Sequence, residues 1–272
     1  MPDHPPLPPV VSSCRLIAFS SLIAGCGPIV ITTGSAPATS APTISTGDQL
    51  VNAMHNRYDG RWYRSITFIQ KSTYYRADGS ILRSETWYEA GAIPGRLRID
   101  LGEPSRGTGV LYRADSMYQL EGGRITDRRV GRNPLMVLGF DVYAQPSYRT
   151  QQQLQSEGIH LAVLRTDSLD GHRMWVVGAA RGDSTTNQFW VDAERLLFVR
   201  LIQTDANGRT RDIRFERYTQ YEGGWVAEEV CVLSGGRMTF HEEYSQVRVN
   251  PTLDENLFLP ERWSSATHWY RP

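Results

Sequence analysis

Apolar and polar side chains alternate with a period of two along most of the chain between residues 61 and 250, which is the pattern of antiparallel β-strands. The alternation is strict over residues 96–101, where apolar and charged residues take opposite faces: Leu97, Ile99 and Leu101 against Arg96, Arg98 and Asp100. Turn residues mark the ends of other alternating segments, at 109–113, 116–121 and 124–130. The whole pattern predicts roughly ten or eleven strands that follow one another as a meander.

Two parts of the chain change to the helical period of 3.6 residues. Before the strands, one helical face collects four apolar residues behind a capping Thr46: Leu50, Val51, Met54 and Tyr58. In the middle of the chain a short helix is expected over 135–142 and a weaker, polar one over 148–157. Because so wide a sheet must curl, the predicted fold class is mainly β: a strongly curved antiparallel sheet, or a closed barrel, with an N-terminal helix and a short helical insertion as its lid.

The N-terminal region has the features of an export signal. Residues 16–25 are apolar, follow Arg15, and are too few to span a bilayer as a helix, which takes about 20 residues. The segment from Leu22 to Cys26 (LIAGC) resembles a bacterial lipobox, in which the cysteine is lipidated. We therefore expect residues 1–25 to be a lipoprotein-type signal peptide and Cys26 to carry the lipid. The alternative is a plain secretory or buried apolar segment with a chance cysteine.

Residues 26–46 are rich in Ser, Thr, Ala, Pro and Gly, a composition that cannot bury enough apolar surface to order itself. They predict a flexible tether between the lipidated cysteine and a folded domain over 47–263, with 264–272 as a C-terminal tail. Gly27 follows the cysteine where enteric bacteria place the Asp that retains lipoproteins in the inner membrane. By that analogy we expect the protein at the periplasmic face of the outer membrane.

The net charge and the motif content of the sequence limit the classes of function that it supports. The net charge is zero, so nothing electrostatic favours a nucleic-acid partner. Two of the three cysteines precede residue 27, which leaves Cys231 alone in an apolar strand, without a base beside it and without a disulfide partner in the domain. The sequence carries no metal-ligand spacing, nucleotide loop or hydrolase motif, so we expect no cofactor, no metal and no catalysis. Paired carboxylates such as Glu228-Glu229 suit solvated strand faces better than hydrolysis.

The order of several short motifs resembles the bacterial lipoprotein-carrier family, which comprises the periplasmic carrier and the outer-membrane receptor of the Lol pathway. The motifs span a helix, three strands and an inserted helix: residues 48–58, 67–71 (TFIQK), 86–89 (TWYE), 93–100 (IPGRLRID) and 133–138 (NPLMVL). The resemblance implies a half-open β-barrel, lidded by helices, whose apolar concave face holds acyl chains. In the soluble carrier an Arg before the proline of the third strand helps to hold the lid shut. Ile93 occupies that position here, so this lock does not carry over.

The resemblance also implies where a ligand would bind. Its concave face would be lined by the apolar sides of two strands, which gives six cavity candidates: Trp62, Ile66, Phe68, Leu97, Ile99 and Leu101. The opposite, charged face is expected in solvent, so Arg98→Glu is predicted to have little effect. We expect a monomeric, non-enzymatic outer-membrane lipoprotein that binds a lipid or an acylated protein. A non-catalytic envelope sensor or structural module with the same fold is the alternative, and a cell-envelope hydrolase is a third.

Overall fold

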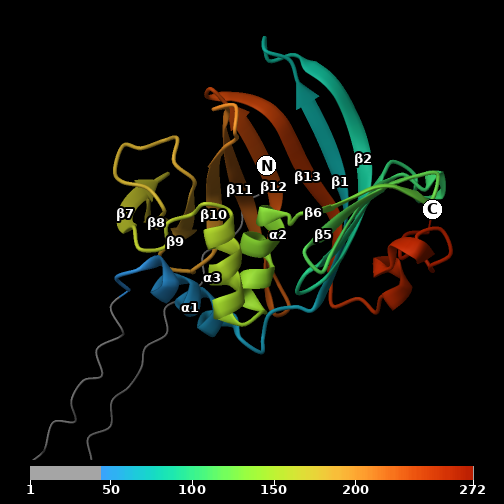
Figure 1. The fold of residues 1–272 in the computed structure, drawn as a ribbon, viewed down its shortest axis with the longest axis horizontal. Helices are drawn as coiled ribbons and strands as arrows, with labels where there is room; N and C mark the ends of the chain where they lie inside the picture. Colours follow the sequence, from blue (N-terminus) through green and yellow to red (C-terminus); the bar gives the residue numbers. More distant parts are fainter. Residues whose placement is uncertain (1–43, 272) are drawn as a thin grey trace, which may run out of the picture. The chain divides into compact units, whose positions relative to one another are not determined.

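The computed structural model describes residues 44–271, and all strands of this part belong to one antiparallel sheet (Figure 1). The sheet has thirteen strands in the order β6-β5-β4-β3-β2-β1-β13-β12-β11-β10-β9-β8-β7. Their bounds are Ser65–Tyr75 (β1), Ile81–Ala92 (β2), Arg96–Leu101 (β3), Gly109–Arg113 (β4), Ser116–Glu121 (β5), Arg124–Val130 (β6), Leu164–Leu169 (β7), His172–Val177 (β8), Gln188–Asp192 (β9), Phe198–Thr204 (β10), Thr210–Tyr221 (β11), Gly224–Ser234 (β12) and Arg237–Val249 (β13). Strands that follow one another in sequence are paired, except that β6 does not pair with β7, and β13 pairs with the free side of β1.

The predicted fold class is confirmed. The fold is mainly β, with one curved antiparallel sheet, an N-terminal helix and a short helical insertion. The sheet is wider than the ten or eleven strands expected. The short strands at the β7 end pair in turn, β7 with β8 and β8 with β9. The alternative of a closed barrel is wrong, since β6 and β7 are the two ends of the strand order and do not pair with each other.

Helix α1 (Gly47–Tyr58) begins where the sequence predicts, because the Thr46 hydroxyl accepts a hydrogen bond from the Gln49 amide at 3.2 Å. Its apolar face is fully buried through Leu50, Val51 and Met54. None of the described helices is both long and apolar enough to cross a membrane.

The insertion between β6 and β7 forms two α-helices, α2 (Pro134–Gly139) and α3 (Ser147–Ser156), joined by a 3₁₀ turn over Asp141–Tyr143. Asn133 caps α2 by accepting a hydrogen bond from the Leu135 amide at 3.0 Å. The expected helix over 135–142 is therefore shorter than predicted and is continued by the 3₁₀ turn.

The three helices cover part of the concave face of the sheet, where Figure 1 shows α2 and α3 in front of β10 to β12. Side chains of the helices and of the sheet share one large apolar core beneath them. The approach is close: a Cβ on Gly139 of α2 would lie 2.9 Å from the Phe215 ring of β11. The helices therefore fill the part of the curved sheet that they cover.

The C-terminal segment after β13 covers the other, convex face of β2 to β5. Two 3₁₀ turns, Glu255–Phe258 and Pro260–Arg262, place Leu257, Phe258 and Trp263 against Ala90, Leu111 and Leu120 of the sheet, and all six side chains are buried. The C-terminal segment covers the convex face of the sheet here, and α2 packs on the concave face of β3. Both faces of β3 are therefore buried.

The expectation that the charged face of β3 lies in solvent is wrong. Arg98 and Asp100 are 2% and 0% exposed and form a bidentate ion pair, with both N···O distances at 2.8 Å. The guanidinium also donates to the Trp263 carbonyl at 3.0 Å and stacks over the Trp263 ring, while His268 Nε2 lies 3.1 Å from Asp100 Oδ2. The ion pair thus joins the C-terminal segment to the sheet.

Candidate ligand-binding site on the concave face

Strand register decides where the six predicted cavity residues lie, because residues paired across antiparallel strands point to the same side. Ile66, Gly91 and Leu97 are paired in turn across β1, β2 and β3, and so are Phe68, Glu89 and Ile99. Leu101 shares its side with its partner Trp87. The five strand residues among the six therefore share one face of the sheet, which is the face that the helices cover.

The six residues lie in different surroundings on that side. Trp62, Ile66 and Phe68 are 1–3% exposed and belong to the core under the helices. Leu97 and Ile99 pack against Met136 of α2. Leu101 is half-buried at the far end of β3.

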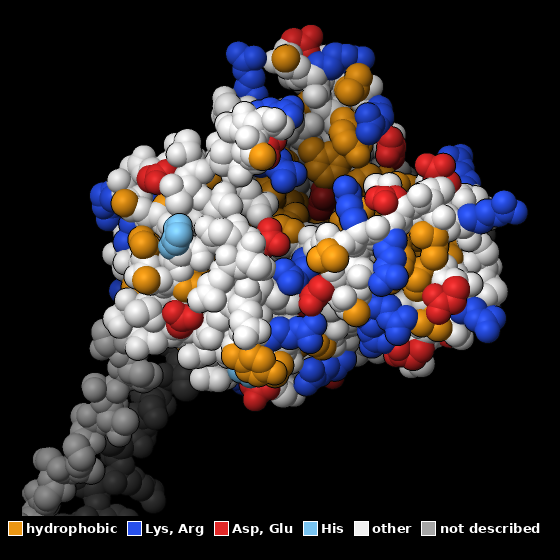
Figure 2. All heavy atoms as spheres, in the orientation of Figure 1, with side chains coloured by type: hydrophobic (Ala, Val, Ile, Leu, Met, Phe, Trp, Pro, Cys, Tyr) orange, Lys and Arg blue, Asp and Glu red, His pale blue; other side chains and the backbone are white. Residues whose placement is uncertain are grey.

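A part of the concave face is left uncovered by the helices, and Figure 2 shows it as a hollow with apolar side chains inside and basic side chains around its mouth. We define this open hollow by five half-buried residues of β1, β2, β3 and β13: Tyr74, Trp87, Leu101, Phe240 and Tyr244. Three of the aromatic rings are near one another, with centroids 4.7 Å apart for Tyr74 and Phe240 and 5.9 Å apart for Trp87 and Phe240. The hollow is an accessible apolar surface of the kind that binds ligands.

Two carboxyl groups that have no cationic partner among the described residues, Glu89 and Glu242, face the same side as these rings, and sequence reasoning missed both. The same side also carries Arg83 and Glu85, which pair with each other at 2.6 Å. Glu89 is opposite Phe68 in β1, and Glu242 is opposite Ser72. Glu89 is 5% exposed and has no hydrogen bond or ion pair with any described residue, whereas Glu242 accepts a hydrogen bond from the Tyr244 hydroxyl at 2.7 Å. Figure 2 shows acidic atoms deep in the hollow. The available signal was the period of two, which places Glu242 on the same side as Phe240 and Tyr244.

Burial raises the pKa of both carboxyl groups, because it disfavours their charged forms. For Glu89, burial and the charge of Glu242 raise the pKa well above its ordinary value. For Glu242, burial raises the pKa to about 7, although the Tyr244 hydroxyl opposes this rise. At neutral pH the hollow therefore holds titratable carboxyl groups within an apolar wall.

These shifts predict that stability falls as the pH rises. Burial also raises the pKa of Asp141 to about 7. Glu242 and Asp141 bind protons more tightly in the folded chain than in the unfolded chain. Their contribution is complete below their ordinary pKa values of 4.5 and 3.8 and is lost as the pH rises through about 7. Urea unfolding should give a free energy about 1–3 kcal/mol lower at pH 8 than at pH 5.

A matched variant separates this effect from general charge repulsion. Glu242→Gln should reduce the fall between pH 5 and pH 8, because glutamine does not titrate. Carboxyl groups with lowered pKa values, such as Asp212 beside Arg200, lose their contribution only at lower pH and do not affect this window. A stability that rises from pH 5 to pH 8 would contradict the assignment.

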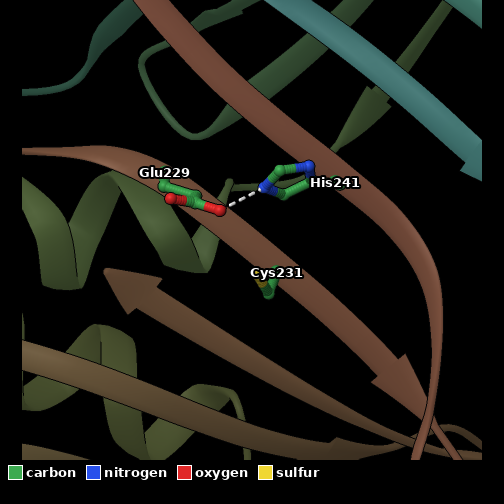
Figure 3. A group of neighbouring side chains, drawn as sticks. All are labelled: Glu229, Cys231 and His241. Atoms are coloured by element: carbon green, nitrogen blue, oxygen red, sulfur yellow. Dashed lines mark hydrogen bonds and ion pairs between the residues drawn. The ribbon is translucent and has the colours of Figure 1, made fainter. Parts of the chain in front are cut away.

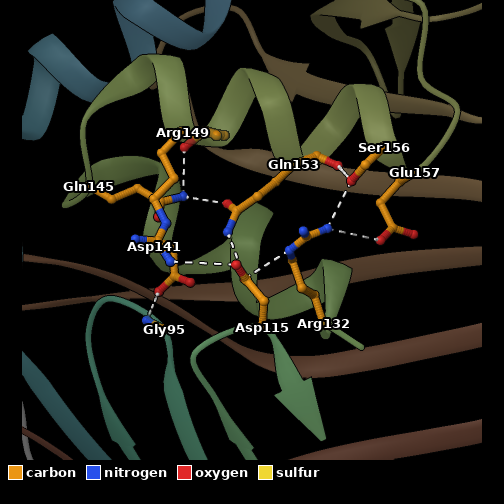
Figure 4. Close-up of polar contacts among 10 residues, drawn as sticks. Gly95, Asp115, Arg132, Asp141, Gln145, Arg149, Gln153, Ser156 and Glu157 are labelled. Atoms are coloured by element: carbon orange, nitrogen blue, oxygen red, sulfur yellow. Dashed lines mark hydrogen bonds and ion pairs between the residues drawn. The ribbon is translucent and has the colours of Figure 1, made fainter. Parts of the chain in front are cut away.

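A polar network attaches the helical insertion to the sheet, as Figure 4 shows. Asp115, in the β4–β5 turn, forms ion pairs with Arg132 at 2.8 Å and with Arg149 of α3 at 3.8 Å. The Gly95 amide, between β2 and β3, donates to the buried Asp141 carboxylate at 3.0 Å. These contacts hold the insertion in place over the sheet. The arginine that helps to hold the lid of the soluble carrier is replaced here by Ile93, which is part of the apolar core.

A second cluster lies on the convex face and combines Glu229, Cys231 and His241, whose ligand atoms are within 4.8 Å of one another (Figure 3). The expectation that Cys231 has no base near it is wrong, because β13 places His241 opposite it. The cluster has three donor types found in zinc sites. Its members are already engaged, however. Glu229 lies 2.6 Å from His241 and 3.0 Å from Arg217, and burial raises the pKa of the Cys231 thiol to about 11. We interpret it as an ion-pair network.

Comparison with known proteins supports the fold. No protein-family model matches the sequence, and no curated protein does. Among solved structures, a domain named for outer membrane lipoprotein sorting from Vibrio parahaemolyticus has a TM-score of 0.54 and 16% identity, and the match covers 80% of this chain and 98% of that one. A LolA superfamily protein from Nitrosomonas europaea has a TM-score of 0.52 and 13% identity, over 76% and 96% of the two chains.

A DUF1329 family protein from Desulfovibrio piger is similar to the same degree, with a TM-score of 0.52 and 16% identity over 78% of this chain and 95% of that one. At these identities the likeness concerns the fold. The chain has the LolA-like fold that the resemblance of its motifs implied, and the match extends over nearly the full length of each of the three structures.

Proposed function

We propose that this protein is a lipoprotein of the outer membrane, held at its periplasmic face by a lipid on Cys26. In this proposal it binds a lipid or the acyl chains of another lipoprotein. It acts as a monomer and without catalysis. The observation that carries the proposal is the open hollow, an accessible aromatic surface on the concave side of a LolA-like sheet. A solved structure named for lipoprotein sorting shares this fold.

The physical argument rests on the apolar surface that a ligand would cover. The rings of the hollow are half-buried and not covered by the helices, so their exposed parts contact solvent. Each methylene group that an acyl chain buries against such a surface contributes about 0.8 kcal/mol. The core beneath the helices is filled, so the open hollow, and not the predicted positions Trp62, Ile66 and Phe68, is the place where a chain would bind.

The binding test uses two neighbours on one strand that face opposite ways. Trp87→Glu places a charge in the open hollow and should weaken binding of a fluorescent fatty acid at least about tenfold, because an acyl chain would have to desolvate it. Thr86→Glu, on the convex face opposite Lys71, is the matched control and should bind like the unaltered protein. Trp87 suits this test better than Ile99, because Ile99 is buried in the cluster with Met136 of α2, whereas Trp87 is half-buried at its edge.

Equal binding by both variants would remove the hollow as the site. If the unaltered protein bound no acyl probe, the alternative of an envelope sensor or structural module with the same fold would be favoured.

The proposed anchor is tested separately, since Cys26 lies outside the described residues. Cys26→Ser should release the protein from the membrane fraction and remove the mass of the lipid. Two or more acyl chains give stable attachment, whereas one chain gives only marginal binding. Membrane association and mass that do not change in the variant would contradict the anchor. They would leave the proposal for the hollow unaffected.

A further inference from the structure

The open hollow combines an apolar wall with two carboxylates that have no cationic partner. Among the described residues, neither Glu89 nor Glu242 forms an ion pair with any Lys or Arg. The basic side chains of β1 and β2 pair with other carboxylates. Arg83 lies on the concave face opposite Tyr74 and pairs there with Glu85 at 2.6 Å, and Lys71 pairs on the convex face with Glu243 at 2.8 Å. The floor of the hollow is therefore acidic and uncompensated.

A buried carboxylate on the convex face of the sheet provides a comparison, because its role is structural. Asp100, on the strand next to Glu89, is 0% exposed and has a bidentate arginine and a histidine as partners. Glu89 is nearly as buried and has none. Burying an unpaired carboxyl group is unfavourable, so a position that keeps one points toward a ligand. Burial holds its pKa above the ordinary value, as expected for a group that lacks its cation.

The aromatic side chains around these carboxylates add a second source of attraction for a cation. Trp87 and Phe240 line the hollow on one side, and Tyr244 stacks on Phe68 with centroids 4.2 Å apart on the other. The Tyr74 ring is already covered by the Arg83 guanidinium, 3.7 Å from its centroid, so the other rings are the ones that a ligand can use. The faces of such rings attract ammonium groups, most strongly where water is excluded. Aromatic walls with carboxylates between them are the chemistry that recognises an organic ammonium group.

We propose that the open hollow selects amphiphiles with a positively charged ammonium group, which would lie at Glu89 and Glu242 while the apolar part of the ligand covers the aromatic wall. The inference rests on the proposed function, since it names the chemical class of ligand for the same site. It goes beyond a cavity for acyl chains, which would discriminate by length and shape and not by charge.

The experiment compares three probes with the same dodecyl chain: dodecyltrimethylammonium, dodecanol and dodecanoate, each below its micelle concentration. Binding is measured on the folded domain at pH 8 by calorimetry. The unaltered protein should bind the ammonium probe at least about tenfold more tightly than the alcohol and should bind the carboxylate most weakly. In the double variant Glu89→Gln, Glu242→Gln the preference for the ammonium probe over the alcohol should fall to about twofold or less.

Glu243→Gln is the matched control, because Glu243 is adjacent to Glu242 on β13 but faces the convex side and pairs with Lys71. It should keep the full preference. The double variant removes two carboxyl groups whose ionisation burial disfavours, so it is expected to fold at least as well as the unaltered protein, and circular dichroism checks this.

The outcomes separate the two proposals. Equal affinity of the unaltered protein for all three probes would overturn the inference and leave a site for apolar chains. A preference for the ammonium probe that persists in the double variant would overturn the assignment to Glu89 and Glu242. Binding of none of the three probes would overturn the proposed function together with the inference.

Discussion

Replacing Arg98 by alanine is expected to lower the free energy of unfolding by about 3–5 kcal/mol, because removal of one partner leaves a buried charge uncompensated. The guanidinium holds both oxygens of Asp100 at 2.8 Å and donates to the Trp263 carbonyl at 3.0 Å. Its loss therefore weakens the strand and the attachment of the C-terminal segment together. Urea unfolding followed by tryptophan fluorescence measures the effect.

The chain supplies a matched control for this prediction. Arg83 and Glu85 form the same kind of pair two residues apart on β2, with an N···O distance of 2.6 Å, but their side chains are 51% and 38% exposed. Arg83→Ala should cost less than about 1 kcal/mol, because solvent screens an exposed pair. Similar losses in the two variants would mean that burial does not set the strength of these contacts. It would also restore the sequence-based expectation for Arg98.

Replacing Trp62 by alanine should be similarly severe, with a loss of about 3–5 kcal/mol in the free energy of unfolding. The indole is 3% exposed and stacks on Tyr143, with centroids 4.0 Å apart, and on Tyr63, with centroids 5.0 Å apart. Tyr58 of α1 contacts the ring edge-on at 5.0 Å. Trp62 thus joins α1, the 3₁₀ turn of the insertion and the start of β1.

Trp87→Ala provides the contrast, since Trp87 is only half-buried and lies at the edge of the small cluster formed by Leu97, Ile99 and Met136. It should cost much less stability than Trp62→Ala but weaken ligand binding. Thermal melts and probe titrations of the two variants test the division of roles. If Trp62→Ala left stability within about 1 kcal/mol of the unaltered protein, the indole would not be the core side chain that we describe.

The strands that sequence analysis bounded most sharply agree with the structure residue for residue: 96–101, 109–113, 116–121 and 124–130. In this region alternating side chains and short turns coincide, so local pattern alone determines each strand. The cap at Thr46 was predictable for the same reason, because it depends on contacts within four residues.

The errors arise where distant segments meet. Alternation shows that β3 has two faces but not what covers them. The charged face seemed solvated because nothing local indicates that Trp263 would pack against it. That Glu89 and Glu242 lie on either side of β1 and on the same face likewise depends on the register of β13, which lies more than a hundred residues along the chain. Strand pattern also does not reveal that the helices cover the part of the concave face where Trp62 lies.

The position of β13 also bears on the order in which the molecule assembles. Strands β1 to β6 and strands β7 to β13 are each local meanders, and the only ladder that joins the two sets in the described sheet is the one between Ser65–Tyr75 and Arg237–Val249. Contacts between segments so far apart in the chain are slow to form, because a long loop must close first. The two meanders can therefore take shape while the middle of the sheet is still open. Since β13 follows all the other described strands in sequence, the two meanders can join into one concave face only after it has been made.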